Sequence, residues 1–269
     1  MLYVYAITDT PGGALDLPAT GILPEVQVAS LPLPGMTAII SSVPNTVFGE
    51  VPLRALLEDS AWTRQRVLAH EEVVAALMPQ GTVLPLKFGT LFSLRDRLTT
   101  TMTHHRPVLE ETLTRLRGAR EWGVKIFYDP NRLRQWTETA KTPEMDVGAL
   151  GAGAAFFARK QHERWLLNQL EIAIRSCVDD SHGRLARLGR AATVCPLQPP
   201  ALHGRREDMV LNGAYLVAEG DEPRLRECLH DLNKTYGNQG VDFVLTGPWA
   251  PYNFTRMHLG ELSEPIRAE

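Results

Sequence analysis

The sequence has few cysteines. Cys177, Cys195 and Cys228 are the three among 269 residues, and no C-x-x-C spacing occurs. This count argues against a disulfide framework or a zinc cage, and it suits a reducing compartment. We therefore expect a cytoplasmic protein whose fold rests on its apolar core.

Long apolar runs and an excess of one charge are also missing. The longest uncharged run, residues 26–49, is interrupted by three prolines and contains several polar residues, whereas a membrane helix needs ~20 mainly apolar residues. Lys and Arg number 28 and Asp and Glu 31, a net charge of −3. Binding to a phosphate backbone needs a basic surface, so we expect neither membrane nor nucleic acid as a partner.

What is present is typical of a globular protein, with 44% hydrophobic and 22% charged residues. The length fits one large domain or two ordinary ones, at roughly 100–200 residues per domain. From the N-terminus to Gly118, which ends a predicted helix, hydrophobic periodicity and turn residues predict both strands and helices. Strands are expected at 2–7, 26–29, 36–43 and 82–88, and helices at 61–77 and 93–117.

After Gly118 the pattern restarts. Strands are expected at 121–128, 192–197, 209–218 and 241–246, and helices at 131–137, 154–190 and 223–236, with a break or bend near 181–183 and a loop at 199–206. The order β-α-β-β-α-β is typical of a ferredoxin-like arrangement. We predict an α+β protein of two domains, 1–118 and 119–269. The second is a modified ferredoxin-like βαββαβ sandwich with a long helical insertion and an aromatic C-terminal tail, 247–269.

No motif predicts a catalytic, cofactor or metal site. His70-Glu71-Glu72 resembles half of a zinc-protease helix, but position 74 is Val where the second His would stand, so we expect a partly buried, hydrogen-bonded His70. The stretch Gly148–Gly153 precedes a helix, where phosphates can bind, but it lacks the G-x-G-x-x-G order.

Two segments are candidates for protein interfaces. Arginines and histidines gather between 181 and 206 without any acid, and Arg184, Arg187 and Arg190 could dock an acidic surface or be solvated. The tail carries Trp249, Tyr252 and Phe254 on a backbone stiffened by two prolines. These aromatics could anchor a partner at low entropic cost, or fold back as a lid over the sheet of their own, C-terminal domain; the two uses are compatible.

Five segments together resemble one family, the gas vesicle protein F/L family (GvpF/GvpL). They are Tyr3–Ile7 (YVYAI), Val83–Thr90 (VLPLKFGT) after His70, Glu121–Lys125 (EWGVK), Gly213–Val217 (GAYLV) and Thr246–Phe254 (TGPWAPYNF). The family often has a second proline at the position of Ala250. The resemblance extends over residues 2–254.

The resemblance implies a non-enzymatic accessory protein for gas vesicle assembly, without a cofactor, in the cytoplasm or at the vesicle. Its expected partners are the small hydrophobic shell protein and other gas vesicle accessory proteins, and its role is chaperone-like, nucleating or a minor structural one. The alternative is a small-ligand-binding or enzymatic ferredoxin-like protein with a site near His70 or Gly148–Gly153.

Overall fold

The computed structural model of the chain describes residues 1–141 and 152–255. By their contacts, these residues form two units, one of residues 1–121 together with the segment from Trp249 onward, and one of residues 122–248. The chain thus passes between the units twice. The described part of the tail packs in the first unit, whereas we expected it in the C-terminal domain, with the boundary at Gly118.

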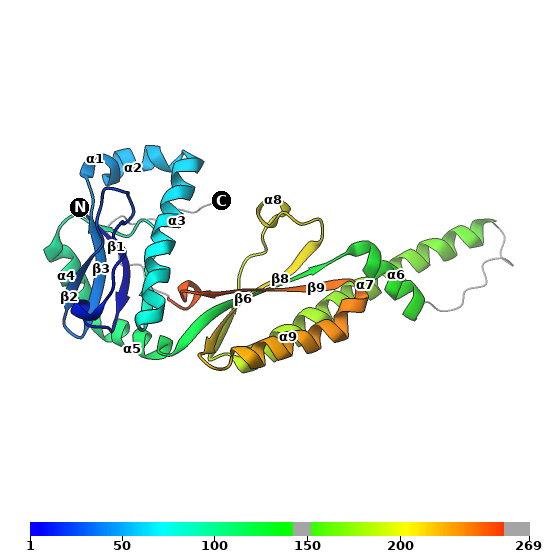
Figure 1. The fold of residues 1–269 in the computed structure, drawn as a ribbon. Coiled ribbons are helices and arrows are strands. Elements are labelled where there is room, and N and C mark those ends of the chain that lie inside the picture. Colours follow the sequence, from blue (N-terminus) through cyan, green and yellow to red (C-terminus); the bar gives the residue numbers. More distant parts are fainter. Residues whose placement is uncertain (142–151, 256–269) are drawn as a thin grey trace. The chain divides into compact units, whose positions relative to one another are not determined.

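The first unit is built on an antiparallel sheet with the order β2-β3-β1-β4, in which β5 also pairs with β1. Its strands are β1 (Leu2–Thr8), β2 (Ala29–Leu33), β3 (Met36–Ser42), β4 (Val83–Pro85) and β5 (Leu91–Phe92). Its helices are α1 (Asn45–Phe48), α2 (Glu50–Leu57), α3 (Ser60–Leu77), α4 (Arg95–His104) and α5 (Arg106–Leu116), and α3 lies alongside the sheet (Figure 1).

Local chemistry explains the central elements of this unit. From Tyr3 to Thr8, β1 is buried at every residue, as expected of a strand flanked on both sides, and it pairs antiparallel with β3. Asp59 caps α3 by accepting hydrogen bonds from the backbone of Ala61 and Trp62 at 2.9 and 3.1 Å.

Two expectations for this unit were wrong, and two helices were not expected. The strand predicted at 26–29 lies at 29–33 instead. The helix predicted at 93–117 is split into α4 and α5 at His105, because Pro107 lies in the first turn of α5 and cannot donate a backbone hydrogen bond to the preceding turn. Helices α1 and α2 were not predicted, since Gly49 and Pro52 in this stretch favour a loop reading.

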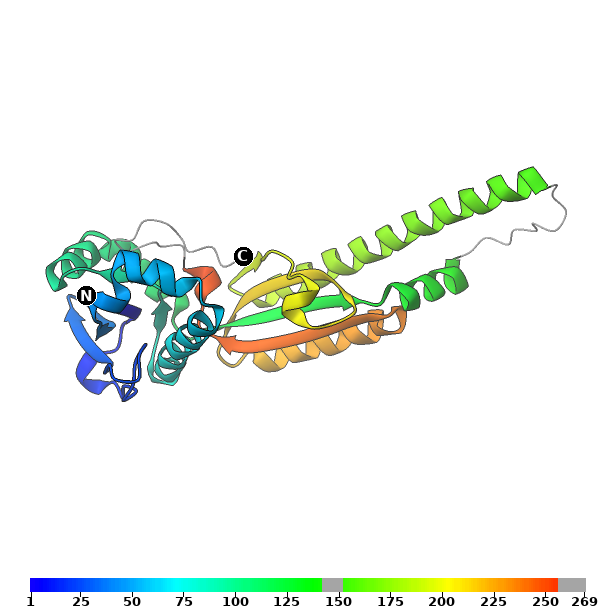
Figure 2. The same ribbon diagram turned by 90° about the horizontal axis from the view of Figure 1, so that it is seen from above.

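The second unit has an antiparallel sheet with the order β7-β8-β6-β9. Its strands are β6 (Ala119–Tyr128, starting in the first unit), β7 (Ala191–Val194), β8 (Asp208–Ala218) and β9 (Val241–Trp249, ending in the first unit). Its helices are α6 (Pro130–Lys141), α7 (Ala152–Leu188), α8 (Pro200–His203) and α9 (Glu222–Tyr236). Helices α7 and α9 cover one face of the sheet, and α8 lies on the other side (Figures 1 and 2).

The core of this unit lies between the sheet and helices α7 and α9. Buried side chains from both layers meet there, among them Trp122, Val124, Leu185, Tyr215, Leu225 and Leu232. Beyond the sheet, α6 packs against α7, and Arg134 forms a bidentate ion pair with Glu163 at 2.8 and 3.1 Å.

Two expectations for this unit were also wrong. No break occurs at 181–183, and α7 continues to Leu188, because Ser181 and Leu185 are both fully buried and this packing outweighs the low helix propensity of Gly183. Part of the loop expected at 199–206 forms the short helix α8. In the described ranges no helix is long and apolar enough to cross a membrane.

Candidate interaction site

The segment that follows β9 returns to the first unit and turns two of its three aromatic side chains inward. Phe254 is only 6% exposed, Tyr252 is half-buried, and Ala250 joins the core of the first unit. Trp249, in contrast, is 54% exposed. The segment therefore folds back, but onto the first unit and not over the sheet of the C-terminal domain as expected, and it leaves Trp249 accessible.

His70 lies at the centre of a hydrogen-bond chain that fastens this segment. Tyr3 Oη and His70 Nδ1 are 2.8 Å apart, and His70 Nε2 is 3.1 Å from the Leu86 carbonyl oxygen and 3.0 Å from Tyr252 Oη. Because a carbonyl can only accept, Nε2 carries the proton and Nδ1 accepts from Tyr3. The Tyr252 hydroxyl in turn donates to the Glu71 carboxylate.

Burial drives the groups of this chain toward their neutral forms. Removal from water lowers the pKa of His70 from 6.5 to about 4, so the ring is neutral at neutral pH and keeps the proton pattern just described. Burial likewise raises the pKa of Glu71. The pKa of Tyr252 is well raised, first by burial and then by the nearby Glu71 carboxylate.

Two further groups hold the backbone of the same segment. The buried Glu121 carboxylate accepts from the backbone nitrogen of Asn253 at 3.0 Å and from its side-chain Nδ2 at 2.6 Å. Arg115, on α5, donates from Nη2 to the Phe254 carbonyl oxygen at 2.7 Å. We call the residues Tyr252–Phe254 with these partners the latch. Elements far apart in the sequence thus meet at one short segment.

Sequence reasoning identified His70 and the aromatics of the latch but missed the residues that hold it. The expected hydrogen bonding of His70 is confirmed, although the ring is fully buried. No role in holding the tail was assigned to Glu71, Arg115, Glu121 or Asn253. One signal was available, because Glu121 and Asn253 each lie in one of the five motifs.

The arginine-rich stretch is largely engaged within the second unit. Arg184 lies 3.8 Å from Asp180 and also interacts with Cys228. Arg205 pairs with Glu207 at 3.2 Å and with Asp242 at 2.7 Å. These acids lie outside the acid-free stretch in the sequence but beside it in the fold, so much of the expected positive charge is neutralised locally.

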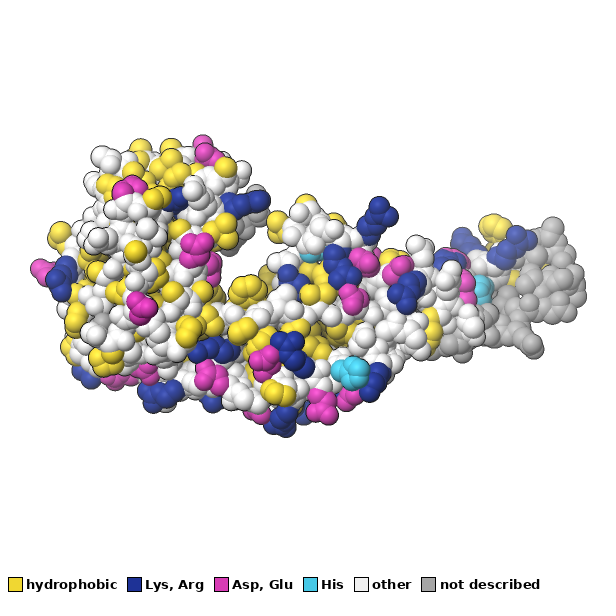
Figure 3. Space-filling model, in the orientation of Figure 1, with side chains coloured by type: hydrophobic (Ala, Val, Ile, Leu, Met, Phe, Trp, Pro, Cys, Tyr) yellow, Lys and Arg dark blue, Asp and Glu magenta, His cyan; other side chains and the backbone are white. Residues whose placement is uncertain are grey.

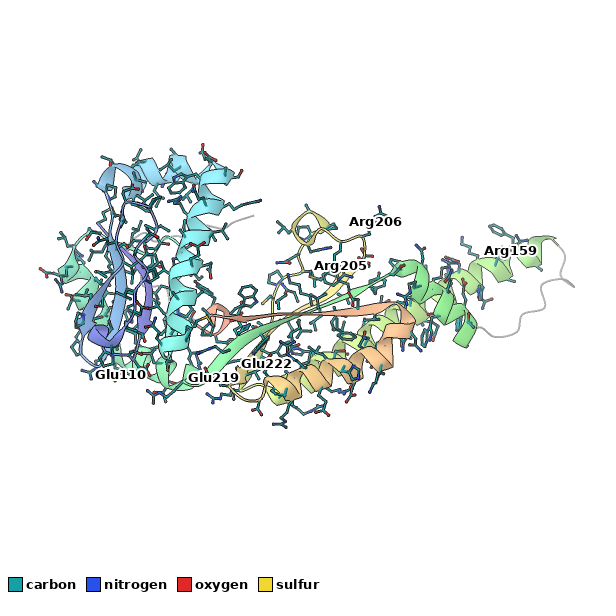
Figure 4. All side chains as sticks on the ribbon, in the orientation of Figure 1. Glu110, Arg159, Arg205, Arg206, Glu219 and Glu222 are labelled. Carbon is teal, nitrogen blue, oxygen red and sulfur yellow. The ribbon has the colours of Figure 1, made fainter. Side chains whose placement is uncertain are left out.

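The remaining arginines of this stretch reach solvent. Arg187, Arg190 and Arg206 are exposed, and Arg206 extends away from the sheet while Arg205 lies closer to it (Figure 4). Of the three arginines singled out, Arg184 is therefore partly buried, and Arg187 and Arg190 are accessible.

The features considered for an enzymatic site do not converge. Residues 148–151 of the glycine-rich stretch lie outside the described residues, and Gly153 lies in the first turn of α7. His70 is enclosed by the latch. No group of three or more His, Cys, Asp or Glu side chains able to hold a metal ion occurs in the ranges 1–141 and 152–255.

A polar cavity of about 400 Å³ lies in the second unit. It is lined by ionic groups that already bind one another or the backbone, including Arg205 with Glu207 and Asp242, and Asp129 with the first turn of α6. No orphaned polar group therefore points into it in the described residues.

The chain is similar to known proteins along nearly its whole length. The family described as "Gas vesicle synthesis protein GvpL/GvpF" matches residues 1–256. Gas vesicle protein L of Streptomyces sp. (strain CB03234) is 31% identical over 252 residues, which cover 94% of this chain and 91% of that protein. Gas vesicle protein F1 of Halobacterium salinarum is 22% identical over 263 residues, covering 96% and 94%.

Solved structures share the fold. The crystal structure of gas vesicle protein GvpF from Microcystis aeruginosa superposes with a TM-score of 0.65 at 21% identity, covering 95% of this chain and 99% of that one. GvpF from Anabaena sp. PCC7120 gives a TM-score of 0.67 at 20% identity, covering 96% and 97%. The mixed helical and antiparallel-sheet fold is therefore that of these structures.

Proposed function

This chain belongs to the GvpL/GvpF family of gas vesicle synthesis proteins, and we propose that it acts as a non-enzymatic accessory protein that binds the small hydrophobic shell protein during gas vesicle assembly. The family that the five motifs indicated is confirmed, and with it a role in gas vesicle assembly. What we propose beyond this is that the partner is the shell protein and that the role is chaperone-like.

Physical chemistry favours such a role. A strongly apolar shell subunit exposes surfaces that aggregate unless another protein covers them before assembly. The chain offers accessible apolar side chains for this purpose. In the second unit Leu197 and Leu202 are 54% and 68% exposed, and hydrophobic side chains gather over its strands between α8 and α9 (Figure 3).

Trp249 carries the proposal most directly. It is the one aromatic of the tail motif that the latch leaves accessible, and the packed residues on its C-terminal side fix its backbone. A large aromatic side chain on a fixed backbone loses little entropy on binding. We assign Trp249 the role of the partner anchor, and Tyr252 and Phe254 the role of holding it in place.

The same proposal includes the other gas vesicle accessory proteins as partners. Arg187 and Arg190 supply exposed positive charge at the end of α7 and just after it, suited to an acidic surface. Replacing Arg187 with Glu should then weaken recovery of an acidic accessory protein and make the remaining recovery less sensitive to salt. Unchanged recovery and salt dependence would remove this residue from the interface.

We further propose that residues 122–248 form a modified ferredoxin-like domain. The strand order β7-β8-β6-β9, with α7 and α9 on one face, supports this assignment. The long N-terminal part of α7 and its partner α6 would be the insertion.

Co-purification tests the proposed function. The tagged full chain is expressed with the small shell protein and the neighbouring accessory proteins, and what is recovered at moderate salt is identified by mass spectrometry. We expect soluble shell protein with the wild type and at least a fivefold loss with Trp249→Ala. Phe157→Ala is the matched control, because Phe157 is an aromatic on α7 that is 71% exposed, more than Trp249.

Two results would count against the proposal. Failure of the folded wild type to retain the shell protein would exclude it as a partner. Equal losses with Trp249→Ala and Phe157→Ala would show that exposed aromatics act nonspecifically. The tail aromatics are not replaced together, because removal of the buried Phe254 ring would disturb the core as well as the surface.

A further inference from the structure

Most sheet edges of this protein are protected against pairing with another strand. In the first unit, β2 contains Pro32, and the opposite edge consists of the short β4, which ends at Pro85, and the two-residue β5. In the second unit, β7 has four residues and is soon followed by Pro196. Short edge strands and prolines are common means of preventing unwanted strand addition.

The edge formed by β9 differs. This strand has nine residues, and within the described ranges only β6 pairs with it. Every residue of β9 after Val241 is at least partly exposed, and Pro248, near its end, is its one proline. Between Val241 and Gly247 the outer backbone N–H and C=O groups of β9 are therefore available for a further ladder.

The side chains of β9 leave the core incompletely covered at this edge. Phe243 and Leu245 pack against the buried core of the second unit but remain partly exposed. Val244 and Thr246 alternate to the other face, where Thr246 Oγ1 donates to the Gly123 carbonyl oxygen at 3.4 Å. Apolar side chains of an added strand would complete the cover over Phe243 and Leu245.

The charge along β9 defines the kind of strand that it can accept. Asp242 is its one charged residue, and its carboxylate lies 2.7 Å from Arg205 Nη2. Phe243–Trp249 carries no charge. A charged strand would lose hydration beside this edge and gain no opposite charge in return, so an uncharged apolar strand fits best.

A second copy of the chain is a poorer occupant than another protein. Two antiparallel β9 strands would place the end of each opposite the beginning of the other, and that end is irregular, since Gly247 has a φ of 113° and Pro248 has no N–H group. Each copy also has its own apolar residues largely packed, whereas an aggregation-prone partner gains burial of exposed strands.

We infer that the β9 edge, from Phe243 to Thr246, binds an extended, uncharged apolar strand of a partner protein by strand addition. The identity of this partner as the shell protein rests on the proposed function; the edge itself does not. The added strand would extend the sheet of the second unit from four strands to five.

Matched lysine substitutions at the two edges of one sheet test the inference. Val244→Lys places a charged side chain on β9, and Val194→Lys does the same on β7, with thermal unfolding used to verify that both fold. We expect Val244→Lys to reduce shell-protein recovery at least tenfold and Val194→Lys to change it less than twofold. Hydrogen exchange supplies a readout on the wild type, in which the outer amides of residues 243–246 should slow in the complex.

The outcomes separate the two proposals. Recovery of the shell protein without protection of residues 243–246, and without loss in Val244→Lys, would overturn the edge while the proposed function stands. If the wild type recovers no shell protein, an uncharged synthetic peptide of alternating valine and threonine with blocked ends is titrated into isotope-labelled protein. Shifts confined to β9 and lost in Val244→Lys would then support the edge, and no shifts would overturn it. If the wild type forms a dimer that the Val244→Lys substitution dissociates, the β9 edge binds a second copy of this chain, and the choice of another protein as the partner would be overturned.

Discussion

Glu121 and Asn253 stand 132 positions apart in the sequence and form a two-point hydrogen bond, with the buried carboxylate accepting from both the backbone and the side-chain nitrogen of Asn253. Glu121 is the last residue of the first unit before the chain leaves it, and Asn253 follows soon after the chain returns. One pair therefore fixes where the C-terminal segment rejoins the first unit.

Replacing Glu121 with Gln should loosen the latch. The amide retains one acceptor but sets its NH₂ group against a donor, so we expect a loss of about 1–2 kcal/mol and roughly tenfold faster exchange of the Asn253 amide. Glu110→Gln is the control, because its exposed pair with Arg106 should contribute less than about 0.5 kcal/mol. Equal exchange in wild type and Glu121→Gln would contradict the role of this pair.

The fold could be predicted from sequence wherever one local signal dominated. The stretch Leu2–Ile7, the helix after Asp59 and the strands around 121–128 and 209–218 have clear periodicity and boundaries, and they lie close to where they were expected. Errors arose where tertiary packing outweighed local preference. Gly183 suggests a break, for example, but buried neighbours on both sides keep it helical.

The candidate site was less accessible to sequence reasoning. The aromatic tail was evident, but which of its side chains point inward depends on partners from α3, α5 and β6. Such contacts, between residues more than 100 positions apart, leave no local pattern. The neutralisation of Arg205 by Asp242 could not be foreseen for the same reason.

Stability should fall in mild acid because of His70. The pKa of His70 is about 4 in the folded protein and 6.5 in the unfolded chain. Below pH 6.5 the unfolded chain therefore takes up a proton that the folded chain does not. The contribution of neutral, buried His70 to the free energy of unfolding is therefore fully present above pH 6.5. It declines as the pH falls and is lost by about pH 4, a change on the order of 3 kcal/mol. Glu71 and Glu121, whose pKa values are raised by burial, act in the opposite direction.

His70→Gln separates these contributions. Gln can still accept from Tyr3 and donate to Leu86 but does not titrate, while both carboxylates remain. Urea unfolding of each protein at several pH values from 7 to 4 gives the difference. We expect the wild type to lose up to about 3 kcal/mol more than the variant over this range. Parallel curves would show that His70 is not held neutral.

The cysteines should differ in reactivity. Cys177 is buried on α7, and burial raises its pKa to about 11, whereas Cys195 and Cys228 are only partly buried. Since the thiolate is the reactive form, an aromatic disulfide reagent at pH 8 should modify Cys195 well before Cys177. Peptide mapping by mass spectrometry measures the order. Early modification of Cys177 would mean that the packing around α7 is open in solution.

Gly183→Ala should stabilise the protein. Gly183 lies inside α7, and an added Cβ would meet only Arg187 Nη1, at 3.8 Å. Alanine in a helix interior is favoured over glycine by about 0.5–1 kcal/mol, which corresponds to a rise in the unfolding temperature of about 1–4 °C. Gly189→Ala is the contrasting variant, because its Cβ would lie 2.9 Å from the Ala191 carbonyl oxygen. A lower unfolding temperature for Gly183→Ala would contradict the unbroken helix.

The central claim is that this chain keeps the hydrophobic shell protein soluble through an exposed apolar surface that includes Trp249. The most direct test is light scattering as the shell protein is diluted from denaturant into buffer containing the folded chain. We predict that near-equimolar wild type suppresses the scattering, that Trp249→Ala does so at least fivefold less effectively, and that Phe157→Ala behaves as the wild type. Scattering that the wild type leaves unchanged, or that all three proteins suppress equally, would contradict the account.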